Sequence, residues 1–279
     1  MIVDVKNIVK ERKIKLKEKV ENLKVNGITP KLVVIFASDD PASEIYVSKK
    51  RNMCGEIGIE EEEFLLDKNV TTDEITSIIH KLNEDVSVHG ILVQLPLYKH
   101  LNENKILESI DPYKDVDGLH PLNLGRLLSN KEGLISCTPR GIMTIINDLG
   151  VDINGKNAVV VGRSVLVGKP IAHLLLNGGA TITLCHSKTN NLKEHTLKAD
   201  ILVVAVGKAK LITADMVKEG STIIDVGINR IEGKIVGDVD TEAVKDIAKF
   251  ITPVPGGVGL TTVLSLLENV TEVASKSLK

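Results

Sequence analysis

The sequence predicts an α/β fold of two domains around a cleft, each with a mostly parallel sheet. Short apolar, β-branched runs alternate with longer amphipathic stretches along the chain, which is the pattern of βαβ units. The 279 residues suit two domains of ordinary size. A polar, loop-rich segment at 111–121 interrupts the alternation, which then starts again. These observations favour two successive α/β domains over one large one.

The first half predicts helices that alternate with three strands. Apolar positions spaced between charges over the first 25 residues predict a surface helix. Apolar, partly β-branched runs predict strands at 32–37, near 64–66 and at 91–95. A helix is expected from about 42 to 55, and Thr71-Thr-Asp-Glu74 is a capping box that should begin another helix.

The second half predicts five more strands. Thr138-Pro139 is expected to form the N-cap and first residue of a helix that ends at Gly150. Strands are expected at 157–161, 181–185, 201–206, 221–226 and 250–253, with helices between them. We therefore expect one domain at 1–117 and a second at 118–279, with the last helix, about 262–279, able to pack back on the first domain.

Composition excludes several classes of protein. A net charge of −2 and a pI near 6.4 provide no basic surface for nucleic acid or an anionic membrane. No run approaches the ~18 apolar residues of a spanning helix, and the charged N-terminus does not resemble a signal peptide. Three cysteines without CxxC spacing argue for reduced thiols in a cytoplasm, and against disulfides or a metal site.

The stretch from Ala158 to Pro170 predicts a strand, a glycine turn and the start of a helix, as in a Rossmann-type domain. Ser164 stands where the second glycine of a GxGxxG fingerprint belongs. Gly162 still permits a tight turn, and Gly168 permits close packing at a positive helix N-terminus, which suits a pyrophosphate. The alternative is an ordinary turn between a strand and a helix.

The end of the next strand favours NADP over NAD. An NAD site commonly has Asp or Glu about 20 residues past the glycines, to bind the ribose 2′-hydroxyl. Here the strand ends Leu184-Cys-His-Ser-Lys188, without an acid. Ser187, Arg163 and Lys188 could hydrogen-bond a 2′-phosphate, which an acid would repel. The alternative interpretation of Ser187 and Lys188 is an ordinary exposed loop.

Ser43, Tyr46 and Lys50 share one face of a predicted helix. A partly buried lysine loses proton affinity through desolvation and can exchange protons near neutral pH. The tyrosine could orient the lysine or stack on a substrate ring. In isolation, the pair could equally be a solvated lysine beside a half-buried tyrosine.

Two polar positions of the first half are expected near this lysine. Gln94 interrupts an apolar strand at its carboxyl end, where open α/β sheets bind ligands. A buried amide needs a hydrogen-bond partner, and a lysine from the preceding helix is suitable. The stretch Asp115-Val-Asp117-Gly118 places two carboxylates in the loop before the second domain. Asp117 could accept paired hydrogen bonds from an amino-heterocycle, or simply form a turn before glycine.

Read together, these segments closely resemble the bifunctional methylenetetrahydrofolate dehydrogenase/methenyltetrahydrofolate cyclohydrolase family. They occur in family order across nearly the whole chain, which makes the resemblance specific. The matching stretches are Asp40–Lys50, Gly90–Leu97, Lys114–Gly118, Cys137-Thr-Pro139, Val160–Ser164, Cys185–Thr189, Asp225–Asn229 and Thr252–Gly259.

The resemblance implies a homodimer that oxidises 5,10-methylenetetrahydrofolate with NADP and then hydrolyses 5,10-methenyltetrahydrofolate to 10-formyltetrahydrofolate. It implies that Lys50 is the catalytic lysine, that Gln94 tunes it, and that Tyr46 stacks on the substrate. It also implies that Asp117 anchors the pterin. The NADP site would be lined by Gly162, Arg163, Ser164, Ser187 and Ile228.

Three other functions share some of these sequence features. A short-chain reductase also uses a Tyr-x-x-x-Lys pair, but there the pair follows the nucleotide-binding turn, whereas here it precedes the turn. A monofunctional dehydrogenase of the same family and a non-catalytic NADP-binding sensor stay open. After Gly259 the family usually has Pro or Ser, then a bulky residue, then Thr, whereas this chain has Leu260-Thr261-Thr262. That departure is expected to change affinity or relative rates rather than to abolish activity.

Overall fold

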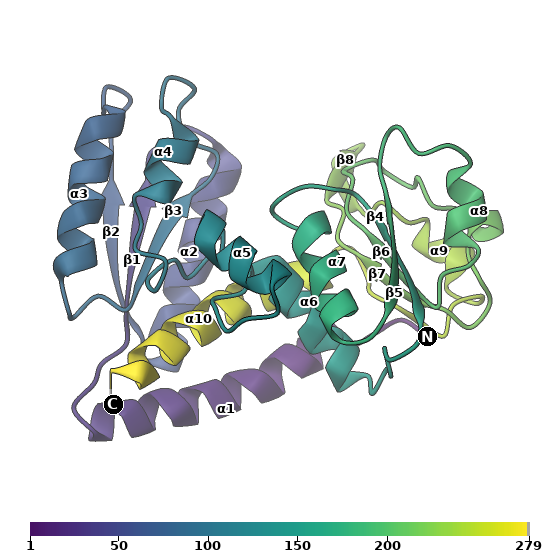
Figure 1. Ribbon diagram of the computed structural model, residues 1–279, viewed down its shortest axis with the longest axis horizontal. Helices are drawn as coiled ribbons and strands as arrows, with labels where there is room; N and C mark the ends of the chain where they lie inside the picture. The colour runs from purple at the N-terminus through teal and green to yellow at the C-terminus, as the bar shows by residue number, and fades with distance from the viewer. Residues whose placement is uncertain (278–279) are drawn as a thin grey trace. The chain divides into compact units, whose positions relative to one another are not determined.

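The structure is a computed structural model that describes residues 1–277, apart from the side chains of residues 41–46 and 49. The chain divides into two compact units, each with its own parallel sheet (Figure 1). The five-stranded unit comprises Met1–Lys10 and Thr138–Thr262, and the three-stranded unit comprises Glu11–Cys137 and the residues from Val263 onward. The predicted α/β class with parallel sheets is confirmed.

The three-stranded unit has a parallel sheet in the order β2-β1-β3. Its strands are β1 (Lys31–Phe36), β2 (Glu60–Leu65) and β3 (Gly90–Gln94). Its helices are most of α1 (Val5–Val25), then α2 (Pro41–Ile57), α3 (Thr72–Glu84), α4 (Glu103–Glu108), α5 (Pro121–Leu128) and the greater part of α10 (Val258–Lys276).

The two faces of this sheet carry different residues. One face is apolar, and α3 and α4 pack against it through a buried cluster that includes Val33, Ile35, Ile79, Val93 and Ile106. Residues paired across parallel strands point to the same side. The register therefore places Gln94 on the opposite face, together with Glu61 and Glu63 of β2.

Strand β2 begins at Glu60, four residues before the expected start near Phe64. Glutamate is disfavoured in strands, so the acidic run from Glu60 to Glu63 does not predict a strand from the sequence. Parallel pairing with β1 supplies its backbone hydrogen bonds. Three of the carboxylates also have cationic partners: Lys31 contacts Glu62 at 2.7 Å, and Arg51 contacts Glu63 and, at 3.8 Å, Glu61.

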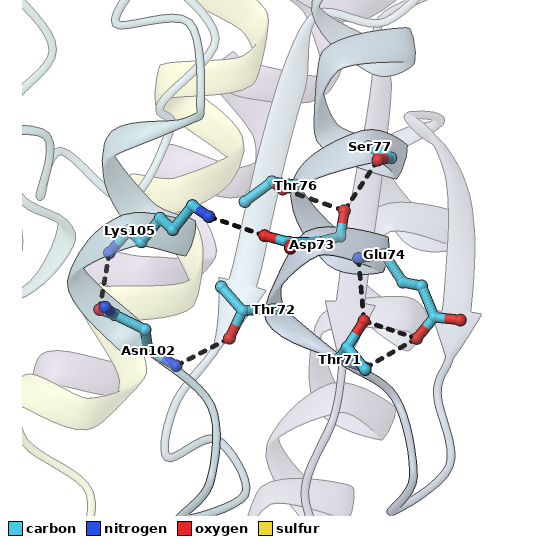
Figure 2. A network of polar contacts seen from close by, with 8 residues as sticks. All are labelled: Thr71, Thr72, Asp73, Glu74, Thr76, Ser77, Asn102 and Lys105. Atoms are coloured by element: carbon cyan, nitrogen blue, oxygen red, sulfur yellow. Dashed lines mark hydrogen bonds and ion pairs between the residues drawn. The ribbon is translucent and has the colours of Figure 1, made fainter.

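The predicted capping box begins helix α3, as Figure 2 shows. Thr71 Oγ1 accepts a hydrogen bond from the Glu74 amide at 3.2 Å, and the Glu74 carboxylate accepts one from the Thr71 amide at 2.8 Å. In the same turn, Asp73 pairs with Lys105 of α4 at 2.7 Å. This turn therefore both caps α3 and attaches α4 to it.

The five-stranded unit has a parallel sheet in the order β10-β7-β6-β4-β5. Its strands are β4 (Asn157–Val161), β5 (Thr181–Cys185), β6 (Ile201–Val204), β7 (Thr222–Asp225) and β10 (Phe250–Ile251). Its helices include α6 (Cys137–Asp148, from Thr138 on), α7 (Gly168–Asn177), α8 (Leu192–Thr196) and α9 (Thr241–Val244). The chain leaves β4 for β5 on one side and later returns to β6 on the other, so the sheet has a topological switch point between β4 and β6.

Two details of this unit differ from expectation. Helix α6 begins at Cys137, so Thr138 lies inside it rather than at its N-cap, and the Thr138 hydroxyl bonds Thr262 Oγ1 at 3.2 Å. An antiparallel hairpin of β8 (Asn229–Ile231) and β9 (Lys234–Val236) was not expected. Its strands are only three residues long and show little apolar alternation, so the sequence pattern does not distinguish them from loop.

Candidate active site

The sheet register of the three-stranded unit brings Lys50 and Gln94 together. Gln94 ends β3, and Lys50 lies in α2, whose residues contact β2 at the other edge of the same sheet. Lys50 Nζ donates a hydrogen bond to Gln94 Oε1 at 2.6 Å. Gln94 Nε2 donates to the Leu95 carbonyl at 2.7 Å, which fixes the amide so that its oxygen faces the lysine. The expected contact between these residues is present.

Lys50 lies in surroundings that favour its neutral form. Burial lowers the pKa of its ammonium group, and the nearby carboxylate of Asp117 partly opposes this effect. A lysine with a lowered pKa carries a neutral amine for a larger fraction of the time at physiological pH. Such an amine can accept a proton and return it, as a general acid–base group must.

The loop that carries Asp117 is held by its neighbour Asp115. The buried Asp115 carboxylate accepts hydrogen bonds from the amides of Leu119 at 3.3 Å and His120 at 2.8 Å, and from Asn123 Nδ2 at 2.9 Å. Burial raises the pKa of Asp115 to about 6 despite these bonds. Of the two carboxylates noted in the sequence, Asp115 therefore shapes the loop.

Asp117 is the carboxylate that the loop presents beside Lys50. Its side chain remains partly exposed, unlike that of Asp115. Burial of its oxygens raises the pKa of Asp117, while Lys50 and the thiol of Cys137 lower it. An amine, an amide and a carboxylate thus converge within a single unit of the protein.

Cys137 is a neighbour of this site that the residue pattern did not predict. Its thiol donates a hydrogen bond to the carbonyl oxygen of Val116 at 3.2 Å, and it also lowers the pKa of the Asp117 carboxyl. Asn269 Nδ2 donates to the same Val116 carbonyl at 2.8 Å. Neither residue is near Asp117 in sequence, so only the folded loop reveals the contacts.

Tyr46 lies in α2, one helical turn before Lys50. Its side chain and that of Ser43 lie outside the described residues. The stacking role of Tyr46 therefore stays a prediction.

In the five-stranded unit, Gly162 lies at the topological switch point. It follows β4 with φ +127°, and a Cβ atom there would lie 2.2 Å from the carbonyl oxygen of Ala205, which follows β6. A Cβ on Gly168, the first residue of α7, would lie 2.0 Å from the Gly162 carbonyl oxygen. Any side chain at either position would collide with backbone. Two glycines thus close a tight turn where open α/β sheets bind nucleotides.

The residues around this turn fit a phosphorylated nucleotide. Ser164 Oγ accepts hydrogen bonds from the amides of Val167 at 3.1 Å and Gly168 at 3.4 Å, which orders the entry into α7. Arg163 and Ser187 are exposed just after β4 and β5, whose last residues are paired. Residues 185–189 contain no acid that would repel a 2′-phosphate.

Ile228 and the unusual Leu260-Thr261-Thr262 segment complete the predicted positions. Ile228 follows β7 and is 55% exposed, as a ligand contact requires. Leu260 to Thr262 lie in the first turns of α10. Thr261 is buried and its hydroxyl donates to the Val258 carbonyl at 2.8 Å, so this side chain is engaged within the helix.

The described residues include no group of three or more His, Cys, Asp or Glu arranged to hold a metal ion. Within residues 1–277, every helix is too short or too polar to cross a membrane.

Comparison with known proteins confirms the predicted family. Residues 3–117 match the family model of the tetrahydrofolate dehydrogenase/cyclohydrolase catalytic domain, and residues 136–278 match that of its NAD(P)-binding domain. The bifunctional protein FolD of Francisella tularensis subsp. novicida is 53% identical over 278 residues, which is 99% of each chain.

Solved structures agree with the sequence comparison. The bifunctional enzyme FolD of Campylobacter jejuni has a TM-score of 0.98 and 48% identity over 99% of each chain. The Trypanosoma brucei enzyme, solved with NADP and an inhibitor, has a TM-score of 0.94 and 34% identity over 100% of this chain and 98% of its own. The chain belongs to the tetrahydrofolate dehydrogenase/cyclohydrolase family.

Proposed function

We propose that this protein oxidises 5,10-methylenetetrahydrofolate with NADP and hydrolyses the resulting 5,10-methenyltetrahydrofolate to 10-formyltetrahydrofolate, with Lys50 as the proton shuttle of the second step. The hydrogen bond from Lys50 Nζ to Gln94 Oε1, in a unit that also holds Asp117, carries the proposal. We place folate in the three-stranded unit and NADP at the switch point of the five-stranded unit.

The dehydrogenase step removes a hydride from the methylene carbon between N5 and N10 of the folate. The product is an amidinium cation whose charge is delocalised over both nitrogens, so no protein base is required. NADP, when bound, supplies the nicotinamide ring that accepts the hydride. The work of the protein is alignment, an effect that reaches about 7–11 kcal/mol in favourable cases. Gly162, Arg163, Ser164, Ser187 and Ile228 would hold the cofactor.

The cyclohydrolase step requires proton transfers. The neutral amine of Lys50 accepts a proton from water as the water oxygen bonds to the bridging carbon. The bond from that carbon to N5 then breaks, and Lys50 returns the proton to N5. The second water proton is released to solvent, which leaves a formyl group on N10. Gln94 holds the amine in place, and Asp117 accepts hydrogen bonds from the pterin.

Replacing Lys50 with methionine tests this assignment, because methionine retains an apolar chain of similar length without the amine. The cyclohydrolase rate should fall by at least ~10²-fold, as expected for the loss of a general acid–base group. The dehydrogenase rate should fall less, and methenyltetrahydrofolate should accumulate. Initial rates of both steps are measured on one preparation, with the exposed Lys68→Met as the matched control.

The outcomes separate the candidate functions. A Lys50→Met variant that hydrolyses methenyltetrahydrofolate at the parent rate would show that Lys50 is not the shuttle. A parent protein with dehydrogenase activity alone would be a monofunctional member of the family. Binding of NADP without either activity would indicate a sensor.

We further propose a homodimer in the cytoplasm. Strand β2 lies at the edge of its sheet, and its last residue, Leu65, is 68% exposed, which suits contact with a second copy. Light scattering should then give twice the 30.2 kDa mass of one chain. Among residues 1–277, the buried Cys54, Cys137 and Cys185 are not joined in disulfides, as expected in a reducing compartment. Thiol titration after unfolding without reductant should detect all three.

A further inference from the structure

Two fully buried aspartates join the loops at the carboxyl edge of the five-stranded sheet. Asp225 ends β7, and Asp238 follows the β8–β9 hairpin. Both have an exposed fraction of 0%. Among the ion pairs of the described residues, none involves either carboxylate. Their hydrogen bonds therefore come from neutral groups.

Asp225 binds the chain on both sides of the hairpin. Its Oδ1 accepts hydrogen bonds from the amides of Gly227 at 2.9 Å and Asp238 at 3.0 Å. Its Oδ2 accepts one from the amide of Val239 at 2.9 Å. The loop that leaves β7 and the segment that returns from β9 are thus attached to one carboxylate.

Asp238 extends this network to the loop after β6. Its Oδ2 accepts hydrogen bonds from the amides of Val206 at 2.7 Å and Gly207 at 3.0 Å. Its Oδ1 accepts one from Asn229 Nδ2 at 2.9 Å. We call Asp225 and Asp238 the aspartate pair.

The chain closes tightly around the aspartate pair. A Cβ atom on Gly227 would lie 2.2 Å from Asp238 Cγ, and one on Gly237 would lie 1.8 Å from Asp225 Oδ2. Side chains at both positions are therefore excluded. Gly227, two residues after Asp225, permits the approach of Asp238, and Gly237, just before Asp238, permits the approach of Asp225.

The segments attached to the pair border the nucleotide turn. The Val206–Gly207 segment follows Ala205, whose carbonyl oxygen abuts Gly162 at the switch point. Ile228 lies between Gly227 and Asn229, both of which bond the pair. Arg163 and Ser187, the residues expected at the 2′-phosphate, follow β4 and β5. A dinucleotide spans the switch point with one half on each side, so its nicotinamide half falls on the side of β6 and β7.

Simple stabilisation does not account for this arrangement. Burial raises the pKa of Asp225 to about 6, and the adjacent Asp238 contributes to the rise. Burying two like charges is costly, and buried charge is weak evidence of a stabilising role. Carboxylates that each accept three directed hydrogen bonds do, however, fix the position of the donors.

We propose that Asp238, held by Asp225, is a positioning residue for hydride transfer, because it fixes the Val206–Gly207 and Ile228 segments against the nicotinamide half of NADP. This inference rests on the proposed NADP site. Because the cyclohydrolase step uses no NADP, the two activities of one preparation distinguish misplacement of the cofactor from general damage.

The Asp238→Asn variant tests the proposal. Its remaining oxygen can still accept from the Val206 and Gly207 amides, but its new NH₂ group then faces the NH₂ of Asn229. The dehydrogenase kcat should fall roughly 10- to 100-fold, the range for a small displacement of reacting groups. Cyclohydrolase activity should stay at the parent level. Adding Asn229→Asp restores a donor facing an acceptor, so the double variant should regain most of the kcat.

Two further variants keep the test decisive. Asp240→Asn is the matched control, because Asp240 pairs with Lys210 at 3.3 Å and does not bond the loops, and it should leave both activities unchanged. If Asp238→Asn does not fold, Asn229→Asp alone places two carboxylates face to face. It should lower the dehydrogenase kcat, and Asp238→Asn should then restore it.

Equal losses of both activities, an unchanged dehydrogenase kcat, or a double variant no better than the single ones would each overturn the inference. A parent protein that does not reduce NADP with methylenetetrahydrofolate would overturn the proposed function as well. If the parent protein reduces NADP and the Asp238→Asn variant has the same dehydrogenase kcat, only the positioning role would be overturned.

Discussion

Replacing Glu61 with glutamine should stabilise the protein at neutral and alkaline pH. The Glu61 side chain is 6% exposed, and its Oε1 has no hydrogen-bond partner among the described residues. Burial, with the neighbouring Glu63 carboxylate, raises the pKa of Glu61 to about 7, and Arg51 at 3.8 Å only partly opposes this. Glutamine has a similar shape and no charge to desolvate.

The pH window follows from the direction of this rise. Between the ordinary value of 4.5 and about 7, folded Glu61 keeps a proton that the unfolded chain has lost. Stability therefore falls as pH rises through that window. The difference of about 2.5 pKa units corresponds to at most about 3–4 kcal/mol. Because the effective dielectric constant around even buried groups is about 20, we expect a smaller gain of about 1–2 kcal/mol.

Urea denaturation from about pH 5 to about pH 8 measures this effect as a free energy of unfolding. The advantage of Glu61→Gln over the parent should be small at the acidic end and grow to its full value at the alkaline end. Glu62→Gln is the matched control, since Glu62 is exposed on the other face and pairs with Lys31. An advantage that does not change with pH, or a loss of stability at pH 8, would refute the reasoning.

Three other substitutions have defined outcomes. Arg163→Ala should raise the KM for NADP roughly 10- to 100-fold, as expected for a lost charge-assisted hydrogen bond, and change that for NAD much less; equal changes in steady-state assays would exclude a 2′-phosphate role. Asp117→Ala should weaken folate binding in calorimetry and lower both activities together, whereas unchanged affinity would leave Asp117 as a turn former. Thr71→Ala removes the α3 cap and should cost about 0.5–2 kcal/mol in urea unfolding at neutral pH, with both activities intact; unchanged stability would show that the cap contributes nothing.

The sequence predicts well the strands buried on both faces, and it also predicts the half-exposed edge strand β5 with its exact bounds. In β1, β3 and β4, successive residues are buried on both faces of the sheet, so these strands consist mainly of consecutive apolar residues. The apolar pattern predicts the start of β2 four residues late, because its edge position and ion pairing permit four glutamates there. The β8–β9 hairpin was missed because its turn, with positive φ at Glu232 and Gly233, depends on conformation rather than on hydrophobic pattern.

The candidate site divides in the same way. The contact between Lys50 and Gln94 is predictable, since Gln94 is a polar residue at the end of a parallel strand next to the helix that carries the lysine. The sequence does not predict that Asp115 holds the loop while Asp117 lies beside Lys50, because this depends on which carboxylate accepts hydrogen bonds from the loop amides. The contacts of Cys137 and the aspartate pair likewise join residues that no sequence spacing relates.

The division of the three-stranded unit along the chain has a consequence for synthesis on the ribosome. Asn269 Nδ2 donates hydrogen bonds to the carbonyls of Val116 and Ile135, which lie on either side of the loop segment that includes Asp117. This asparagine is translated only after residues 138–262, the main part of the other unit, have been made. Although domains generally fold in order of emergence, the three-stranded unit, whose sheet is translated first, would be completed last. A nascent chain would thus fix the loop that carries Asp117 only after the five-stranded unit has been translated.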